Sequence, residues 1–304
     1  MMLKSREFVG GKDGPRLLIT GGVHGDEFEP MASTRRLIEM FDDDPQLRER
    51  LRGTLHIVPV VNEPAFLRGH RVAEEDQLDL ARVCPGNPDG SITERIAAAL
   101  SKLIGQADYY IDLHTGGTEL SVWPLAGYGL VDDLEIREMQ HKMALAFNLP
   151  LVWGTSAKLD GRSMSVARDA NVPAIYAEYF GSATMLRQGV DDYVDGCLNV
   201  MGLIGMLDHE KQGHRVEHVI IDDRPESGFM QICNPSPMTG FFKPLVEPGD
   251  TIQEGQLFGT VVDVLGDERM EVRAENSGLV VVLRTFPRVQ KGDSLGVIAE
   301  FNEF

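Results

Sequence analysis

The most constraining feature of the sequence is a short apolar run followed by a glycine-rich turn near the N-terminus. Residues 17–20 (Leu-Leu-Ile-Thr) lead directly into Gly21-Gly22-Val23-His24-Gly25-Asp26-Glu27. The apolar run is typical of a buried parallel strand, and glycine permits a tight turn because a positive φ costs it little. A helical pattern then extends from about Glu27 to Met40. A strand, a turn and a helix in this order predict an α/β fold, and such folds carry their chemistry at this kind of turn.

Two separate strand ends supply residues that can bind a metal. His24 and Glu27 are three residues apart, a spacing that suits two ligands of one zinc ion, although an ordinary exposed turn would look the same. A third ligand follows the apolar run 109–113, which ends in His114 and a glycine turn. Asp112 lies on the same face of that strand as His114 and could orient its imidazole. Three protein ligands leave a fourth position for water, which is the arrangement of a catalytic zinc.

Charge and composition exclude several classes of function. The 304 residues suit one large or two moderate domains, and 42% hydrophobic and 25% charged residues are typical of a globular protein. A net charge of −18 argues against nucleic acid as a partner, but it is compatible with an anionic small molecule. Three irregularly spaced cysteines indicate a reducing compartment rather than a disulfide framework. The absence of a long apolar run predicts no membrane span, and we expect a cytoplasmic protein.

A carboxylate and several arginines are further candidates. Glu178 ends the apolar run that begins at residue 172, and a carboxylate is costly to bury there unless it is stabilised or used. It could act in catalysis or simply pair with an arginine. The stretch 66–89 lacks regular periodicity and contains Arg68, Arg71 and Arg82. A loop of this length is usually functional or disordered, so these arginines either contact a substrate or form surface ion pairs.

The ordered set of motifs resembles a known family. His24-x-x-Glu27, residues 79–86, Asp112-Leu113-His114-Thr115 and Glu178 are together similar to the aspartoacylase and succinylglutamate desuccinylase branch of the zinc carboxypeptidase-like metallohydrolases. The resemblance covers most of the first two hundred residues. It implies a mixed, mostly parallel sheet flanked by helices. It also implies one Zn²⁺ per chain bound by His24, Glu27 and His114, with Glu178 as general acid and base.

The same resemblance assigns roles to the arginines. Arg71 matches the arginine that polarises the scissile carbonyl, with Arg68 as the alternative. Arg82 matches the arginine of an Asn-Arg pair that holds a substrate carboxylate, but Ala81 stands where the family usually has asparagine. The family also supplies an arginine from the region 151–170, for which we expect Arg162, with Arg168 as the alternative.

The pattern changes after a polar segment that begins at residue 209. Short apolar runs are then separated by Gly-Asp turns, and residues 246–256 and 289–295 form similar hairpin patterns. This part resembles a small all-β barrel-sandwich domain of the biotinyl/lipoyl type. The modified lysine of such carriers is replaced by Glu268-Arg269-Met270, so we expect a lid or an oligomer contact rather than a carrier. The sequence therefore predicts a catalytic domain over 1–208 and a β-rich domain over 209–304.

Three hypotheses follow from these features. The first is a zinc-dependent amidohydrolase that cleaves a small N-acylated amino acid or related N-acyl amine, with Arg82, Arg162, Arg68 and Arg168 as candidate substrate contacts. The second is a zinc carboxypeptidase, and the third is a non-catalytic binding or carrier protein. The intact ligand set together with Glu178 favours the first. The resemblance also implies a homo-oligomer, with a dimer as the family-level expectation.

Overall fold

The fold is described from a computed structural model, which covers residues 3–211, 213–225, 227–229 and 233–301. Its centre is an eleven-stranded sheet whose main path runs β1-β3-β2-β4-β7-β5-β13-β10. Parallel neighbours dominate its first part: β2 (Lys12–Thr20) pairs with β3 (Arg52–Val58) and β4 (Tyr109–Leu113), and β4 pairs with β7 (Ala174–Gly181). The mixed sheet expected from the sequence is confirmed, and its parallel pairs are concentrated in this part.

Antiparallel strands close both sides of this parallel core. β1 (Arg6–Val9) forms an edge against β3, and β5 (Leu120–Leu130) runs antiparallel to β7. β5 is in turn parallel to β6 (Leu151–Ser156), which pairs with β8 (His218–Ile221). The carboxyl ends of β2, β4 and β7 therefore lie side by side at one edge of the sheet.

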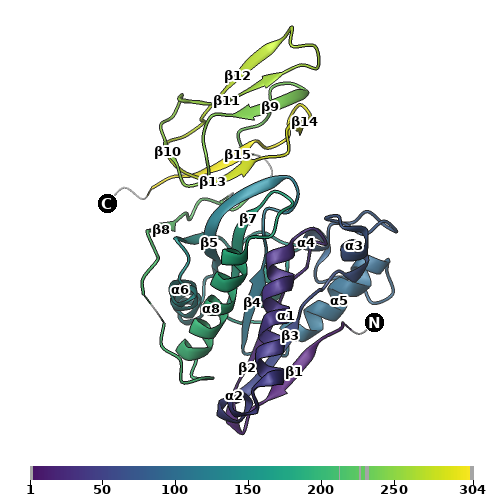
Figure 1. Cartoon of the computed structure of the whole chain (residues 1–304), viewed down its shortest axis with the longest axis vertical. Coiled ribbons are helices and arrows are strands. Elements are labelled where there is room, and N and C mark those ends of the chain that lie inside the picture. Colours follow the sequence, from purple (N-terminus) through teal and green to yellow (C-terminus); the bar gives the residue numbers. More distant parts are fainter. Residues whose placement is uncertain (1–2, 212, 226, 230–232, 302–304) are drawn as a thin grey trace.

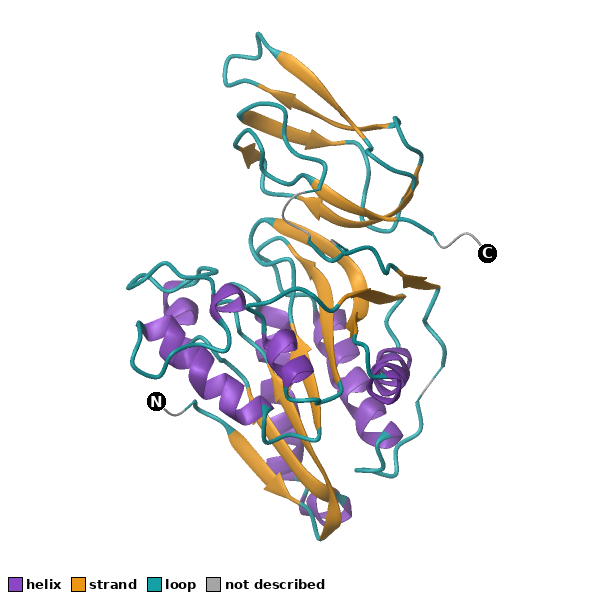
Figure 2. Ribbon diagram, turned by 180° about the vertical axis from the view of Figure 1, so that it is seen from behind, coloured by secondary structure: helices purple, strands orange, loops and turns teal. Residues whose placement is uncertain are grey.

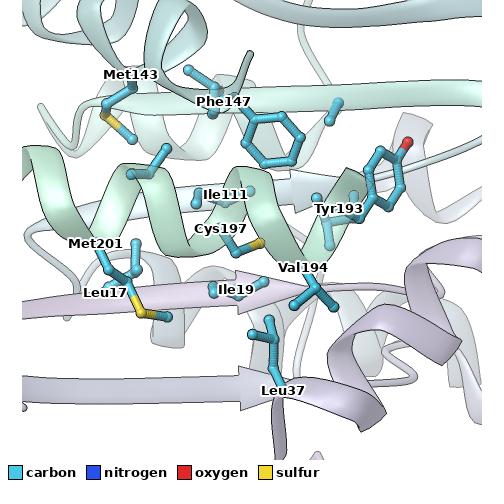
Figure 3. Close-up of a cluster of buried hydrophobic side chains, with 14 of the residues drawn as sticks. Leu17, Ile19, Leu37, Ile111, Met143, Phe147, Tyr193, Val194, Cys197 and Met201 are labelled. Carbon is cyan, nitrogen blue, oxygen red and sulfur yellow. The ribbon is translucent and has the colours of Figure 1, made fainter. Parts of the chain in front are cut away.

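Helices cover both faces of the sheet because its central strands are apolar on both sides. On one face, α1 (Phe28–Asp43), α6 (Leu134–Phe147) and α8 (Arg187–Leu203) bury a cluster with Leu17 and Ile19. Figure 1 shows α1 and α8 along this face, and Figure 3 shows Cys197 of α8 close to Ile111 of β4. On the other face, α5 (Ile92–Ile104) packs over Leu18 and Tyr110.

Three of the remaining short helices, α3 (Glu63–Arg68), α4 (Leu80–Val83) and α7 (Ser163–Asp169), lie around the edge that carries the strand ends. The fourth, α2 (Pro45–Arg50), follows α1 at the opposite end of the sheet, before β3 begins (Figure 1). The start of α5 is capped, since Glu94 accepts a hydrogen bond from the Ser91 amide at 2.8 Å. The stretch 66–89, expected to lack periodicity, contains the end of α3 and all of α4.

The C-terminal part is built from antiparallel strands (Figure 2). One four-stranded sheet has the order β12-β11-β9-β14, formed by β9 (Gly240–Pro244), β11 (Leu257–Val262), β12 (Arg269–Arg273) and β14 (Arg288–Val289). Three other strands, β10 (Thr251–Ile252), β13 (Gly278–Arg284) and β15 (Gly296–Ala299), extend the large sheet instead. β13 pairs with β5 through Val282 opposite Val122.

This junction ties the C-terminal strands to the loop that follows β4. The buried Arg284 contacts Glu119 at 3.1 Å, and the amide of Thr285 donates to the Glu119 carbonyl at 2.9 Å. The boundary at residue 209 and the role of this part as a lid or oligomer contact stay predictions. So do the cytoplasmic location and the homo-oligomer. Within the described residues, no helix is long and apolar enough to cross a membrane.

Candidate metal centre and substrate pocket

Three candidate ligands meet where β2 and β4 end. His24 and Glu27 lie in the turn between β2 and α1, and His114 follows β4 directly. Thr20 and Asp112, near the ends of the two strands, are paired in the sheet, which sets the turn and His114 side by side. The turn also passes close to α3: a Cβ atom at Gly25 would lie 2.1 Å from the carbonyl carbon of Ala65. Position 25 of this turn therefore accepts only glycine.

The donor atoms of these ligands face one another. Nδ1 of His24 lies 2.6 Å from Oε1 of Glu27, and Nδ1 of His114 lies 3.0 Å from its Oε2. One ligand atom from each of the three residues falls within 4.8 Å of the others. Glu27 is 1% exposed. Its burial acts to raise its pKa, but the charges of His24 and His114 outweigh this effect and lower it, so the carboxylate is ionised.

The other nitrogen of each imidazole faces a carboxylate. Nε2 of His114 lies 3.1 Å from Oδ2 of Asp112, the contact expected from their shared strand face. Asp112 is itself held by the Thr20 hydroxyl at 2.7 Å and by Ser163. Nε2 of His24 lies 3.1 Å from Oδ1 of Asp79, at the start of α4. Asp79 belongs to the motif set in the sequence, but the orienting role of its side chain was not predicted.

This donor set fits a metal ion. Two Nδ1 atoms and one ionised carboxylate converge, and each imidazole has its outer nitrogen opposite a carboxylate, as in many zinc sites. Donors of this kind suit zinc and related divalent ions, among which ligand type alone discriminates weakly. Among the described residues, this is the one cluster of histidine, cysteine and acidic side chains that meets the geometry of a metal site.

Glu178 lies beside this cluster with an unused oxygen. It is the fifth residue of β7, it is 7% exposed, and its Oε2 atom has no hydrogen-bond partner among the described residues. Burial raises the pKa of Glu178 to about 8. A buried carboxyl group of this kind either needs a hydrogen-bonding or charged partner or has a functional role. Because Glu178 lines the same pocket as His24, Glu27 and His114, its free oxygen can exchange a proton with a molecule bound there.

Three of the predicted arginines, Arg71, Arg82 and Arg162, line the pocket. Arg71 donates from Nε and Nη2 to Asp79 at 3.1 and 2.9 Å, and its Nη1 lies 3.9 Å from Glu27. Arg82 and Arg162 also line the pocket, and in the described part of the chain no carboxylate forms an ion pair with either. The Arg162 guanidinium lies 5.7 Å from the centre of the Phe229 ring. Burial, followed by the charge of Arg82, lowers the pKa of Arg162 to about 10.

The two alternative arginines are engaged elsewhere. Arg68 donates to the carbonyls of Val72 and Ala73 at 3.3 and 3.4 Å, and it does not line the pocket. Arg168 touches the pocket wall, but its guanidinium forms ion pairs with Asp160 at 2.8 Å and Asp169 at 2.7 Å. Local chain folding already provides partners for both side chains, and the role of Arg68 or Arg168 as a substrate contact stays a prediction.

The pocket is small and partly apolar. Its volume is about 140 Å³. Apolar side chains form part of the wall, namely Leu120, Val122, Val131, Leu159 and Met164. Hydroxyl groups form another part, including Thr155 and Tyr176, neither of which was predicted from the sequence. The only available signal was the position of Tyr176 two residues before Glu178, which places both on one face of the strand.

Comparison with known proteins gives a consistent result. The sequence model of the "Succinylglutamate desuccinylase/Aspartoacylase catalytic domain" matches residues 13–204. The chain is 32% identical over 298 residues to N-alpha-acetyl-L-2,4-diaminobutyric acid deacetylase of Halomonas elongata, covering 96% of this chain and 84% of the relative.

Solved structures share the whole fold. A succinylglutamate desuccinylase from a Silicibacter species superposes with a TM-score of 0.88 at 26% identity, covering 99% of this chain and 89% of the other. The product-bound structure of the ectoine utilization protein EutE (DoeB) from Ruegeria pomeroyi gives a TM-score of 0.86 at 26% identity, with the same coverage.

Proposed function

The chain belongs to the succinylglutamate desuccinylase/aspartoacylase family, and from this premise we propose that it is a zinc-dependent hydrolase of small N-acyl amino acids. Membership of this family and the similarity to the Halomonas deacetylase support deacylase activity. The observation that carries the zinc-dependent mechanism is the convergence of three donors and Glu178 on one small pocket. His24, Glu27 and His114 would hold one Zn²⁺ per chain. When bound, this ion supplies a Lewis acid that polarises the acyl carbonyl and acidifies water.

Glu178 is the proton-transfer group of this proposal. Its free Oε2 atom accepts a proton from the water whose oxygen adds to the acyl carbon. The same carboxyl group then gives that proton to the amide nitrogen as the carbon–nitrogen bond breaks. The products are a carboxylic acid and a free amino group, so atoms and charge balance. Burial raises the pKa of Glu178 to about 8, close to neutral pH, so the group can both take up a proton in the first step and release it in the second.

Arg71 stabilises the charge that develops on the carbonyl oxygen. Its guanidinium is fixed by two hydrogen bonds to Asp79, so it is oriented before the substrate arrives. Asp79 thus joins His24 and Arg71, and one carboxylate sets the direction of a metal ligand and of a catalytic cation together.

Arg82 and Arg162 bind the carboxylate of the amino-acid part. Both lack a carboxylate partner in the described part of the chain, and two neighbouring cations favour an anion between them. Ala81 offers no side-chain donor beside Arg82, so this carboxylate lacks the amide contact typical of the family. We therefore propose an N-acetylated amino acid other than aspartate, with N-acetyl-2,4-diaminobutyrate, the substrate named for the Halomonas relative, as the first compound to test.

The test combines metal content with a substrate panel. The purified protein, loaded with Zn²⁺ and then dialysed, is expected to hold one equivalent by elemental analysis. It should release free amine from at least one N-acyl amino acid, and the metal-free protein should not. A carboxypeptidase, the alternative from the sequence, would instead cleave C-terminal residues from peptides, so a peptide panel run in parallel separates the two. Stoichiometric metal with no hydrolysis of any acyl amino acid would contradict the proposal.

A further inference from the structure

Tyr176 projects into the pocket from the same strand face as Glu178. The two residues are separated by Ala177 on β7, and both line the pocket. In the sheet, Tyr176 stands opposite Gly127 of β5 and beside Asp112 of β4. Tyr176 has no role in the proposed hydrolytic mechanism.

Gly127 fixes where the ring of Tyr176 can lie. A Cβ atom at position 127 would be 2.1 Å from Cζ of Tyr176 and 2.4 Å from its hydroxyl oxygen. The ring of Tyr176 therefore occupies space that only a glycine at position 127 leaves open. Thr155 of β6 is a buried residue that also lines the pocket, and its side chain is close enough to lower the pKa of the Tyr176 phenol. Both residues thus present a hydroxyl-bearing side chain to the same pocket.

Glu178 and Arg162 line the same pocket as these two hydroxyl-bearing side chains. Burial raises the pKa of the Tyr176 phenol, Glu178 raises it further, and Arg162 lowers it, so the hydroxyl is neutral and close to both charges. In the proposed function, Glu178 contacts the amide nitrogen of the substrate, and Arg162 contacts its carboxylate. In an α-amino acid these two groups are attached to the same carbon, and that carbon also bears the side chain.

We infer that the hydroxyl groups of Tyr176 and Thr155 form the subsite for the substrate's side chain and select a side chain that ends in a hydrogen-bonding group. The inference rests on the proposed function, because Glu178 and Arg162 define the two ends of the substrate. A neutral phenol and a neutral alcohol can each donate and accept, so an amine or a hydroxyl satisfies them. A methyl group of the same size offers neither hydroxyl a hydrogen bond in a partly dry pocket.

Three N-acetylated amino acids of nearly equal size test this selection. Their side chains differ only at the end: 2,4-diaminobutyrate carries an amine, homoserine a hydroxyl and norvaline a methyl group. For the zinc-loaded protein we expect kcat/KM for the better of the two polar compounds to exceed that for N-acetylnorvaline by roughly tenfold or more. In Tyr176→Phe this ratio should fall about tenfold, because the ring stays in place and only the hydroxyl is lost. Thr155→Val should shift the ratio in the same direction.

A matched control separates selection from a general loss of structure. Tyr128 is the neighbour of Gly127 on β5, and its hydroxyl bonds His141 at 2.9 Å outside the pocket. Tyr128→Phe should leave the ratio unchanged. Equal loss of activity on all three compounds in both Tyr176→Phe and Thr155→Val would overturn the inference and leave the proposed function standing. A preference of the unmodified, zinc-loaded protein for N-acetylnorvaline would do the same. Failure to hydrolyse any N-acyl amino acid would instead overturn the proposed function, and this inference with it.

Discussion

Oδ1 of Asp79 lies 3.1 Å from Nε2 of His24, although the two residues are 55 positions apart in the chain. The contact lets the short helix α4 orient a metal ligand that belongs to the turn after β2. Oδ2 of the same carboxylate accepts two hydrogen bonds from Arg71. The pKa of Asp79 is lowered, because its contacts with His24 and Arg71 outweigh the effect of burial. One ionised side chain therefore couples the metal site to the carbonyl-binding arginine.

Removal of that charge should weaken metal binding. We expect Asp79→Asn to lower Zn²⁺ affinity by roughly 10- to 100-fold, the usual effect of losing a carboxylate that orients a ligating imidazole. Competition with a chromogenic chelator measures this affinity directly. Asp160→Asn is a suitable control, because Asp160 pairs with Arg168 at an exposed position. Equal affinities for the Asp79 and Asp160 variants would show that His24 needs no such partner.

The third ligand has the simplest test. His114→Ala removes one of two imidazole donors and leaves the metal with His24 and Glu27 alone. We expect elemental analysis to show most of the zinc lost after dialysis. A circular dichroism spectrum confirms that the variant is folded. A stoichiometric zinc content in the folded variant would remove His114 from the site.

Position 81 should influence the choice of substrate. An asparagine beside Arg82 would add a hydrogen-bond donor, whereas Ala81 leaves an acceptor on an acidic substrate unmet, a loss of about 1–3 kcal/mol. N-acetylaspartate and N-succinylglutamate should therefore be poor substrates, and Ala81→Asn should raise kcat/KM toward one of them. Comparison across a panel of N-acetyl amino acids provides the check. If either acidic compound proved to be the best substrate of the unmodified protein, the proposed effect of Ala81 would be wrong.

The junction with the C-terminal strands should matter for stability. Arg284 is 8% exposed, contacts Glu119, and donates from Nε to the Ser294 carbonyl at 3.0 Å. Arg284→Ala removes the buried donor to the Ser294 carbonyl and the ion pair with Glu119, so we expect the free energy of unfolding to fall by about 1–3 kcal/mol. Arg187→Ala is the control, because the Arg187 side chain is 95% exposed. Urea denaturation of both variants measures the difference, and equal stabilities would show that the junction contributes little.

The sequence predicts local chemistry better than contacts between distant segments. Apolar runs ending in His24 and His114 are local patterns, and parallel strands bring their carboxyl ends together, so the ligand set follows from the sequence. The contact of Asp79 with His24 depends on how the segment 66–89 folds back, which no periodicity encodes. The same holds for Arg68, whose donors are satisfied by its own loop.

The pairing of β5 with β13 was hidden for a related reason. Both strands are apolar, so each could equally have packed against helices or loops. The pairing and register of segments far apart in the chain are set by tertiary packing. Tyr176 was overlooked because an aromatic residue in an apolar strand is typical of a core. Its place in the pocket depends on Gly127 in a neighbouring strand.

The most direct test of the account is the substitution Glu178→Gln, which keeps the size of the side chain and removes its proton-transfer ability. The variant should fold and hold one zinc per chain by elemental analysis. Its kcat on the best N-acyl amino acid should fall by roughly 10²-fold or more, as expected for loss of acid–base catalysis. Turnover equal to that of the unmodified protein, with zinc in place, would make Glu178 a structural residue and contradict the mechanism.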